Sequence, residues 1–146
     1  MEAQRIIVTG GATRIGAATI TEIEFMTTAF SKAAGGTLSM RVRFDEEVTV
    51  DTTGGTPHFV INNTTNAARH QTCLYVSGSG TNELIFGKTL SAGSGDINAS
   101  DVLNVIANPL AQHGGSTIKD KGTTTDSEIT SSTAIGTAAG TLTIAA

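Results

Sequence analysis

The sequence predicts an all-β domain, and three of its features support that prediction. Short segments alternate apolar and polar residues with a period of two, which is the pattern of strands with one buried face. Clusters of Gly, Asn, Asp and Ser separate these segments, and the 17 glycines favour tight turns. The one stretch with helical potential, residues 27–34, is short and rich in Thr. This rhythm of strands and turns is typical of a sandwich or a barrel.

Length and charge restrict the class of protein further. The 146 residues suffice for one domain with one core. Charged residues make up only 15% of the chain, against about 25% on average, and the net charge is −4. We therefore expect no nucleic-acid partner and no membrane association, since both favour basic surfaces. Cys73 is the only cysteine, so we expect a packed thiol, with no internal disulfide and no thiolate zinc site.

The chain divides into three parts by composition. Residues 1–18 form an arm rich in Gly, Ala, Thr and Ile, without the pattern of a secretory signal. Residues 19–121 contain the alternating segments and are predicted to form the sandwich. Residues 122–146 are low in complexity and rich in β-branched side chains, so they are expected to form either an extended arm or a final strand.

The clearest strand spans residues 38–45 and is preceded by a second one at residues 19–25. In the second, Thr21, Ile23 and Phe25 share one face, opposite Ile20. A hairpin turn is expected at residues 77–80. The other predicted strands span residues 47–51, 57–62, 69–76, 82–90, 101–107 and 116–120. The predicted core consists of the inward-facing apolar residues Phe25, Leu38, Met40, Val42, Phe44, Phe59, Ile61, Leu84 and Phe86.

Five motifs within residues 20–120 carry a family resemblance. They are Gly36-Thr37-Leu38, the runs 42–50 and 75–86, the loop 92–96 and the segment 114–120. In this order and spacing they resemble the bacterial immunoglobulin-like repeats of large adhesins and surface proteins, which also occur on tailed-phage virion proteins. The resemblance implies an immunoglobulin-like antiparallel β-sandwich of about seven to nine strands. It also implies a scaffold for display and adhesion, which fixes no particular chemistry.

A second resemblance concerns the segment from Arg5 to Gly16. It is similar to the opening strand and phosphate turn of short-chain dehydrogenases, which implies NAD(P) binding. That family requires an amphipathic helix next, whereas residues 17–25 alternate with period two. The only tyrosine, Tyr75, is followed four residues later by Ser79 instead of the family's lysine. We therefore expect no cofactor and no enzyme, and an NAD(P)-binding fragment stays an alternative.

Candidate metal and acid–base residues are few. Asp96, Asn98 and Asp101 offer oxygen ligands for Ca²⁺ but lack the Asp-x-Asp-x-Asp-Gly pattern, so turn formation is expected and no metal is assigned. The histidines are expected on the surface, because their spacing is not that of metal ligands; they are His58, His70 and His113. The acidic run 45–47 is expected to be a solvated turn between strands, not a glycosidase-like carboxylate pair.

These expectations together predict a structural protein. The leading hypothesis is a virion protein assembled in the host cytoplasm, most simply a phage capsid decoration (cement) protein or another virion-surface protein. Its partners would be the major capsid protein or another virion protein, together with sister subunits. The arms would provide the contacts through aliphatic residues suited to strand addition, namely Ile6, Ile7, Val8, Leu142 and Ile144. The alternative is an adhesion or carbohydrate-binding module at the cell surface.

Overall fold

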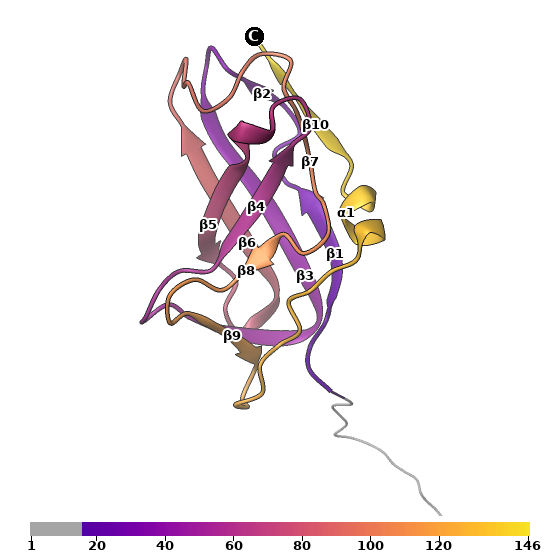
Figure 1. Cartoon of the computed structure of the whole chain (residues 1–146). Helices are drawn as coiled ribbons and strands as arrows, with labels where there is room; N and C mark the ends of the chain where they lie inside the picture. The colour runs from indigo at the N-terminus through magenta and orange to yellow at the C-terminus, as the bar shows by residue number, and fades with distance from the viewer. Residues whose placement is uncertain (1–15) are drawn as a thin grey trace, which may run out of the picture.

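The strand β3 (Gly36–Asp51) is the longest element of the computed structural model, which describes residues 16–146 (Figure 1). Its inner face is apolar and buried, as the alternation predicts. It pairs antiparallel with three strands: β1 (Ile20–Phe25), β6 (Thr81–Leu90) and β9 (Thr117–Asp120). The predicted division of this region into two strands with a turn at residues 45–47 is wrong. The pairing with β6 becomes irregular between Arg43 and Val48, which accommodates the acidic run inside a continuous strand.

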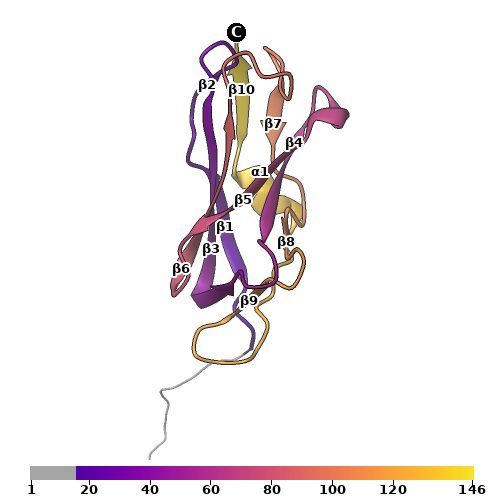
Figure 2. The same ribbon diagram turned by 90° about the vertical axis from the view of Figure 1, so that its left-hand side faces the viewer.

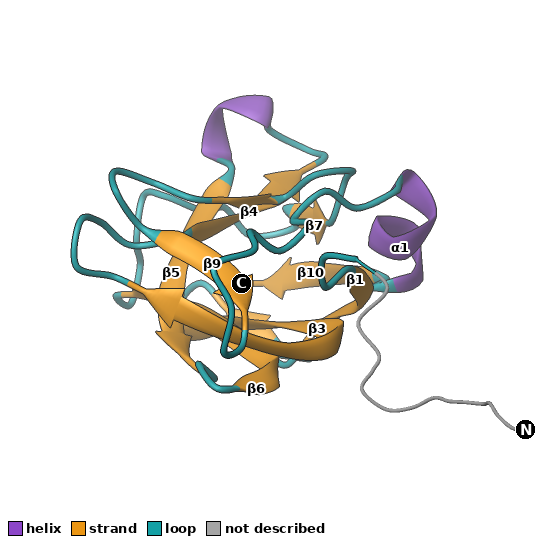
Figure 3. Cartoon of the chain, turned by 90° about the horizontal axis from the view of Figure 1, so that it is seen from below, coloured by secondary structure: helices purple, strands orange, loops and turns teal. Residues whose placement is uncertain are grey.

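The strands form one curled sheet in the order β1-β3-β6-β5-β4-β7-β10-β2, with β8 on β4 and β9 on β3. The remaining elements are β2 (Phe30–Ser31), β4 (His58–Asn63), η3 (Ala67–Arg69), β5 (Gln71–Ser77), β7 (Val102–Asn104), β8 (Leu110–Ala111), α1 (Thr133–Ala138) and β10 (Thr141–Ala145). All strand pairings are antiparallel except that of β10 with β2. In the end-on view β4 and β7 lie across from β3 and β6 (Figure 3). Strands make up 49% of the structure and helices 7%, so the all-β prediction is confirmed.

The core fills the space between the two sides of the curled sheet (Figure 2). The predicted core residues that are buried are Leu38, Met40, Val42, Phe44, Phe59, Ile61, Leu84 and Phe86. Phe25 is only partly buried and packs against this cluster from its rim. The rings of Phe59 and Phe86 lie 6.0 Å apart between centroids in a tilted arrangement, so aromatic packing links β4 to β6.

The face assignment predicted for residues 19–25 is wrong at the beginning of the strand. The register of β1 against β3 shifts between Ile20 and Glu22. This irregularity turns Ile20 toward the core, so that Ile20 and Ile23 are both buried while Thr21 is exposed. Ala18 is also buried, and its N–H donates to Asp120 Oδ1 at 2.9 Å, so the last residue of the expected arm belongs to the domain.

Two alternatives are expected for the C-terminal segment, an extended arm or a final strand. The structure shows the strand, and it belongs to the chain's own sheet. β10 pairs with β7 and β2, and the Ile144 N–H also donates to the Asp101 carbonyl at 2.9 Å. Leu142 and Ile144 are buried in the core. Their expected role as anchors on a partner chain is therefore corrected: alternating aliphatic residues complete the protein's own core. The other expected anchors, residues 6–8, lie outside the described residues.

Truncation of Phe44 tests the core assignment. Phe44 is 1% exposed, so Phe44→Ala should lower the free energy of unfolding by about 3 to 5 kcal/mol, because it leaves a cavity. Val76 is 62% exposed, and the control Val76→Ala should change this free energy by less than about 0.5 kcal/mol. Urea denaturation measures both values. Equal effects of the two substitutions would show that the inner face is wrongly assigned.

Candidate functional site

A cavity of about 340 Å³ opens where η3, β6 and the loop after β6 meet. It is lined by Ala68, Arg69, His70, Lys88 and Asp96, and we call it the basic pocket. Two of these lining residues belong to η3. This element lies at the end of the domain that carries the C-terminus, opposite the end where the described chain begins (Figure 1). Ligand pockets usually measure about 300 to 1,000 Å³, so this one has room for one small molecule or one unit of a polymer.

Lys88 is the most unusual side chain of the basic pocket. It lies opposite Leu38 in the register of β3 and β6, on the face of β6 that carries the buried Phe86 and Leu90. Only 27% of its side chain is exposed, and its Nζ is 3.6 Å from Asp96 Oδ2, whose side chain is 63% exposed. Lysines are rarely placed toward a core, because removing the ammonium from water is costly. This position therefore marks the pocket as a candidate site.

Arg69 and His70 bring further hydrogen-bond donors to the pocket. Among residues 16–146 the Arg69 guanidinium has no ion-pair partner. The Nδ1 atom of His70 accepts a hydrogen bond from the Asn63 N–H at 3.3 Å. The proton of this imidazole is then carried on Nε2, which can donate it to a ligand.

The amide of Gln71 joins the two walls of the pocket, and Lys32 holds the loop after β6 from its other side. Gln71 is fully buried, and its Nε2 donates to the carbonyl of Arg69 at 2.9 Å and to that of Asp96 at 2.8 Å. On the far side of the loop, Lys32 Nζ donates to the carbonyls of Ser94 and Ile97 at 2.9 and 2.8 Å. The pocket is thus fixed in shape before a ligand enters, which reduces the entropic cost of binding.

The three calcium candidates occupy different environments. Asp96 lies in the basic pocket beside Lys88. Asp101 is buried, and its Oδ2 accepts from the Asn98 N–H at 2.8 Å and from Asn63 Nδ2 at 2.9 Å, which closes the turn between residues 98 and 101. No group of three or more His, Cys, Asp or Glu side chains in residues 16–146 could hold a metal ion.

Two histidines are in contact, although their positions in the sequence do not indicate it. The rings of His58 and His113 have centroids 5.0 Å apart and are inclined by 46°. His58 lies on β4 opposite Ala111 of β8, and this pairing brings the loop with His113 beside it. Partial burial, with a smaller contribution from the charge of His113, lowers the pKa of His58.

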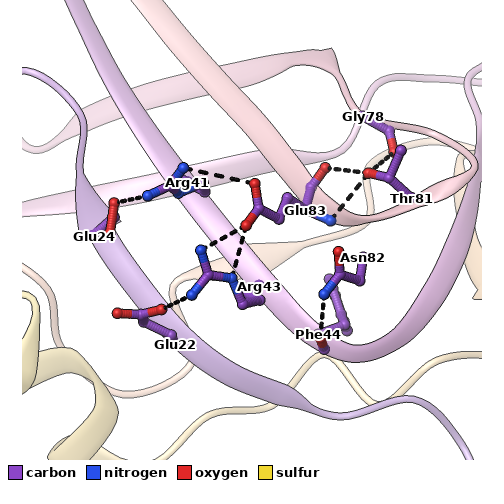
Figure 4. Close-up of polar contacts among 9 residues, drawn as sticks. All are labelled: Glu22, Glu24, Arg41, Arg43, Phe44, Gly78, Thr81, Asn82 and Glu83. Atoms are coloured by element: carbon purple, nitrogen blue, oxygen red, sulfur yellow. Dashed lines mark hydrogen bonds and ion pairs between the residues drawn. The ribbon is translucent and has the colours of Figure 1, made fainter.

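The outer face of the sheet carries a network of ion pairs (Figure 4). Arg43 is shared between Glu22 and Glu83, with its Nε 2.8 Å from Glu83 Oε2, and the hydrogen bond to Glu83 is the main reason that its pKa is raised. Arg41 joins Glu24 to Glu83 in the same way. Each carboxylate of the network faces an arginine from a neighbouring strand. The network therefore links β1, β3 and β6 and keeps this face polar.

The acidic run 45–47 makes structural contacts. The carboxylate of Asp45 accepts from the N–H and the hydroxyl of Thr19 at 2.8 and 3.0 Å. Glu47 pairs with Lys121 at 2.7 Å. These contacts attach β3 to the segments before β1 and after β9.

Cys73 has the packed thiol that the sequence predicts. Its side chain is fully buried, and burial raises its pKa to about 12. The thiolate is the reactive form of cysteine, so this residue is protonated at neutral pH and has no nucleophilic character.

Short-chain dehydrogenases require a helix after the glycine-containing motif. In this protein the chain at that point forms the strand β1. Most of the glycine-containing motif, residues 5–15, lies outside the described residues.

No helix within residues 16–146 has the length and apolar character needed to cross a membrane. Comparisons of the chain with models of known families, with curated proteins and with solved structures gave no match.

The depressed pKa of His58 predicts a pH dependence of stability. In the unfolded chain a histidine takes up its proton near pH 6.5, whereas folded His58 stays neutral to lower pH. Stability present above about pH 6.5 should therefore be lost as the pH falls below this value and through the lower pKa of folded His58. His58→Gln should reduce this loss, and His113→Gln should reduce it by a smaller amount, because only the minor cause is removed. Thermal denaturation at several pH values measures the effect, and identical slopes in wild type and His58→Gln would contradict it.

Proposed function

We propose that this chain is a non-enzymatic structural protein of a virion surface, a phage capsid decoration protein built on an immunoglobulin-like sandwich. The observation that carries the proposal is the arrangement of the two ends of the domain. The described chain enters at one end, and η3 and the C-terminus lie at the other (Figure 1). Residues of η3 line the basic pocket. A protein arranged in this way can be attached at one end and present a surface at the other.

The motifs that resemble immunoglobulin-like repeats occupy framework positions. Gly36-Thr37-Leu38 opens β3, and the run 42–50 continues that strand. The run 75–86 includes the hairpin from β5 to β6, in which Gly78 and Gly80 have φ values of 113° and 89° that favour glycine. The segment 114–120 leads into β9. This agreement between motifs and framework supports the immunoglobulin-like assignment.

The chemistry of the described residues supports a structural role. The Cys73 thiol is buried and protonated. The carboxylates of the outer face are paired with arginines. His70 uses Nδ1 to accept a backbone hydrogen bond, which leaves this nitrogen unavailable as a general base. These residues favour binding and scaffolding over catalysis.

Attachment through the N-terminal segment follows from the burial of β10. Leu142 and Ile144 are used in the protein's own core, so they are not free to bind a partner. Residues 6–8 precede the domain and supply the aliphatic run Ile6-Ile7-Val8. Such a run can add a strand to the sheet edge of a capsid protein or a sister subunit. The alternative, a cell-surface adhesion module, is favoured by the basic pocket.

Substitution of the N-terminal aliphatic run tests the proposed attachment. The triple variant Ile6→Ser, Ile7→Ser, Val8→Ser should weaken co-sedimentation with particles purified from the native source by about tenfold or more, because apolar contacts are lost. Its melting temperature should stay unchanged, since the proposed attachment segment lies outside the described core, which begins at Ala18.

The control Thr9→Ser, Thr13→Ser changes the same segment without touching its aliphatic residues and should bind like wild type. Equal binding by the triple variant would refute attachment through this segment. Binding of the wild-type chain to cell envelopes and not to particles would replace the virion hypothesis by the adhesion alternative.

A further inference from the structure

We propose that the basic pocket binds one carboxylate-bearing sugar, such as a uronic acid unit of a surface polysaccharide. This inference concerns the pocket and does not involve the proposed attachment residues 6–8, so it can fail while the proposed function stands. It is based on the charge balance, the mixture of donors and acceptors, and the size of the pocket.

The charges of the pocket leave one positive charge without a partner. Among the described residues that line the pocket, Arg69 and Lys88 are cationic and Asp96 is the only carboxylate. Asp96 is the more exposed member of its 3.6 Å pair with Lys88. The Arg69 guanidinium has no ion-pair partner among the described residues. A guanidinium binds planar oxyanions with two parallel hydrogen bonds, so a carboxylate of the ligand fits Arg69.

A carboxylate matches this charge better than a phosphate does. A phosphate monoester carries about −1.5 to −2 charges at neutral pH, which exceeds the single unbalanced charge and would be repelled by Asp96. Asp96 can instead accept hydrogen bonds from hydroxyl groups at the rim, and His70 Nε2 can donate to a ring or hydroxyl oxygen. A sugar acid presents both kinds of group.

The lining and the size also favour a sugar over a nucleotide. Within residues 16–146 the lining includes no Phe, Tyr or Trp on which a base could stack, and Ala68 offers only a methyl group. The volume of about 340 Å³ lies at the lower end for ligand pockets. His70 and Asp96 are exposed, so the rest of a polymer chain could continue into solvent.

Titration of the full chain with three small probes tests the assignment. The probes are D-glucuronate, D-glucose and inorganic phosphate, and binding is followed through the backbone amide NMR signals of residues 68–70, 88 and 96. D-glucuronate should saturate these signals in the millimolar range, a usual affinity for a single small ligand. D-glucose, which has the same ring without the carboxylate, should not saturate them. Phosphate should bind more weakly than D-glucuronate, and added salt should weaken both.

Variants identify the groups involved. Arg69→Gln and Lys88→Met should each weaken D-glucuronate binding by about tenfold or more, because each removes a charged donor. Asp96→Asn should raise phosphate affinity relative to D-glucuronate, because it removes the repelling carboxylate. Lys121→Gln changes a lysine that pairs with Glu47, outside the pocket, and should bind like wild type. Because Lys88 is partly buried and its variant could unfold, Arg69→Gln and Asp96→Asn test the proposal independently.

Three results would overturn the proposal. They are an absence of saturation by D-glucuronate, equal binding of D-glucose, and tighter binding of phosphate than of D-glucuronate. The last result would assign the pocket to phosphate groups instead.

Discussion

Burial of the inner face of β3 is the interaction on which the rest of the structure depends. Leu38, Met40, Val42 and Phe44 each contribute about 1.5 to 3 kcal/mol by leaving water. This burial fixes the register with β6, which places Lys88 opposite Leu38 and turns it inward. A slip by one residue would turn Gly87 inward and Lys88 out to solvent. The same register that builds the core therefore builds the basic pocket.

The C-terminal strand β10 completes the domain's own sheet. Leu142 and Ile144 close the core, and β10 holds β7 and β2 together. The basic pocket is built at the end where β6 and η3 meet, and buried Gln71 ties its walls. The proposed attachment then falls to residues that precede the domain. The residues that complete the core thus differ from those proposed for ligand binding and for attachment.

Local sequence pattern predicted the inner faces of the central strands, because a period of two is a property of each strand alone. It failed at the irregularity that turns Ile20 inward. It also could not decide between an arm and a final strand for the C-terminal segment, because the strands that pair with β10 are distant in the chain. The contact of His58 with His113 has no local signal either. Lys88 could have been noticed, since it interrupts the apolar alternation of Leu84, Phe86 and Leu90. Asp96 was singled out for calcium, but its partner is a lysine.

Hydrogen exchange in the isolated chain tests most directly the central claim, that the domain completes its own sheet with β10. In β10 the Ile144 N–H donates a hydrogen bond to the Asp101 carbonyl at 2.9 Å. Its amide should exchange with the same free energy of opening as the core amides of β3, because both require global unfolding. This equality should be independent of protein concentration. Rapid exchange at residues 141–145 while β3 stays protected would contradict the account, and would return the C-terminal segment to the role of an arm that binds other chains.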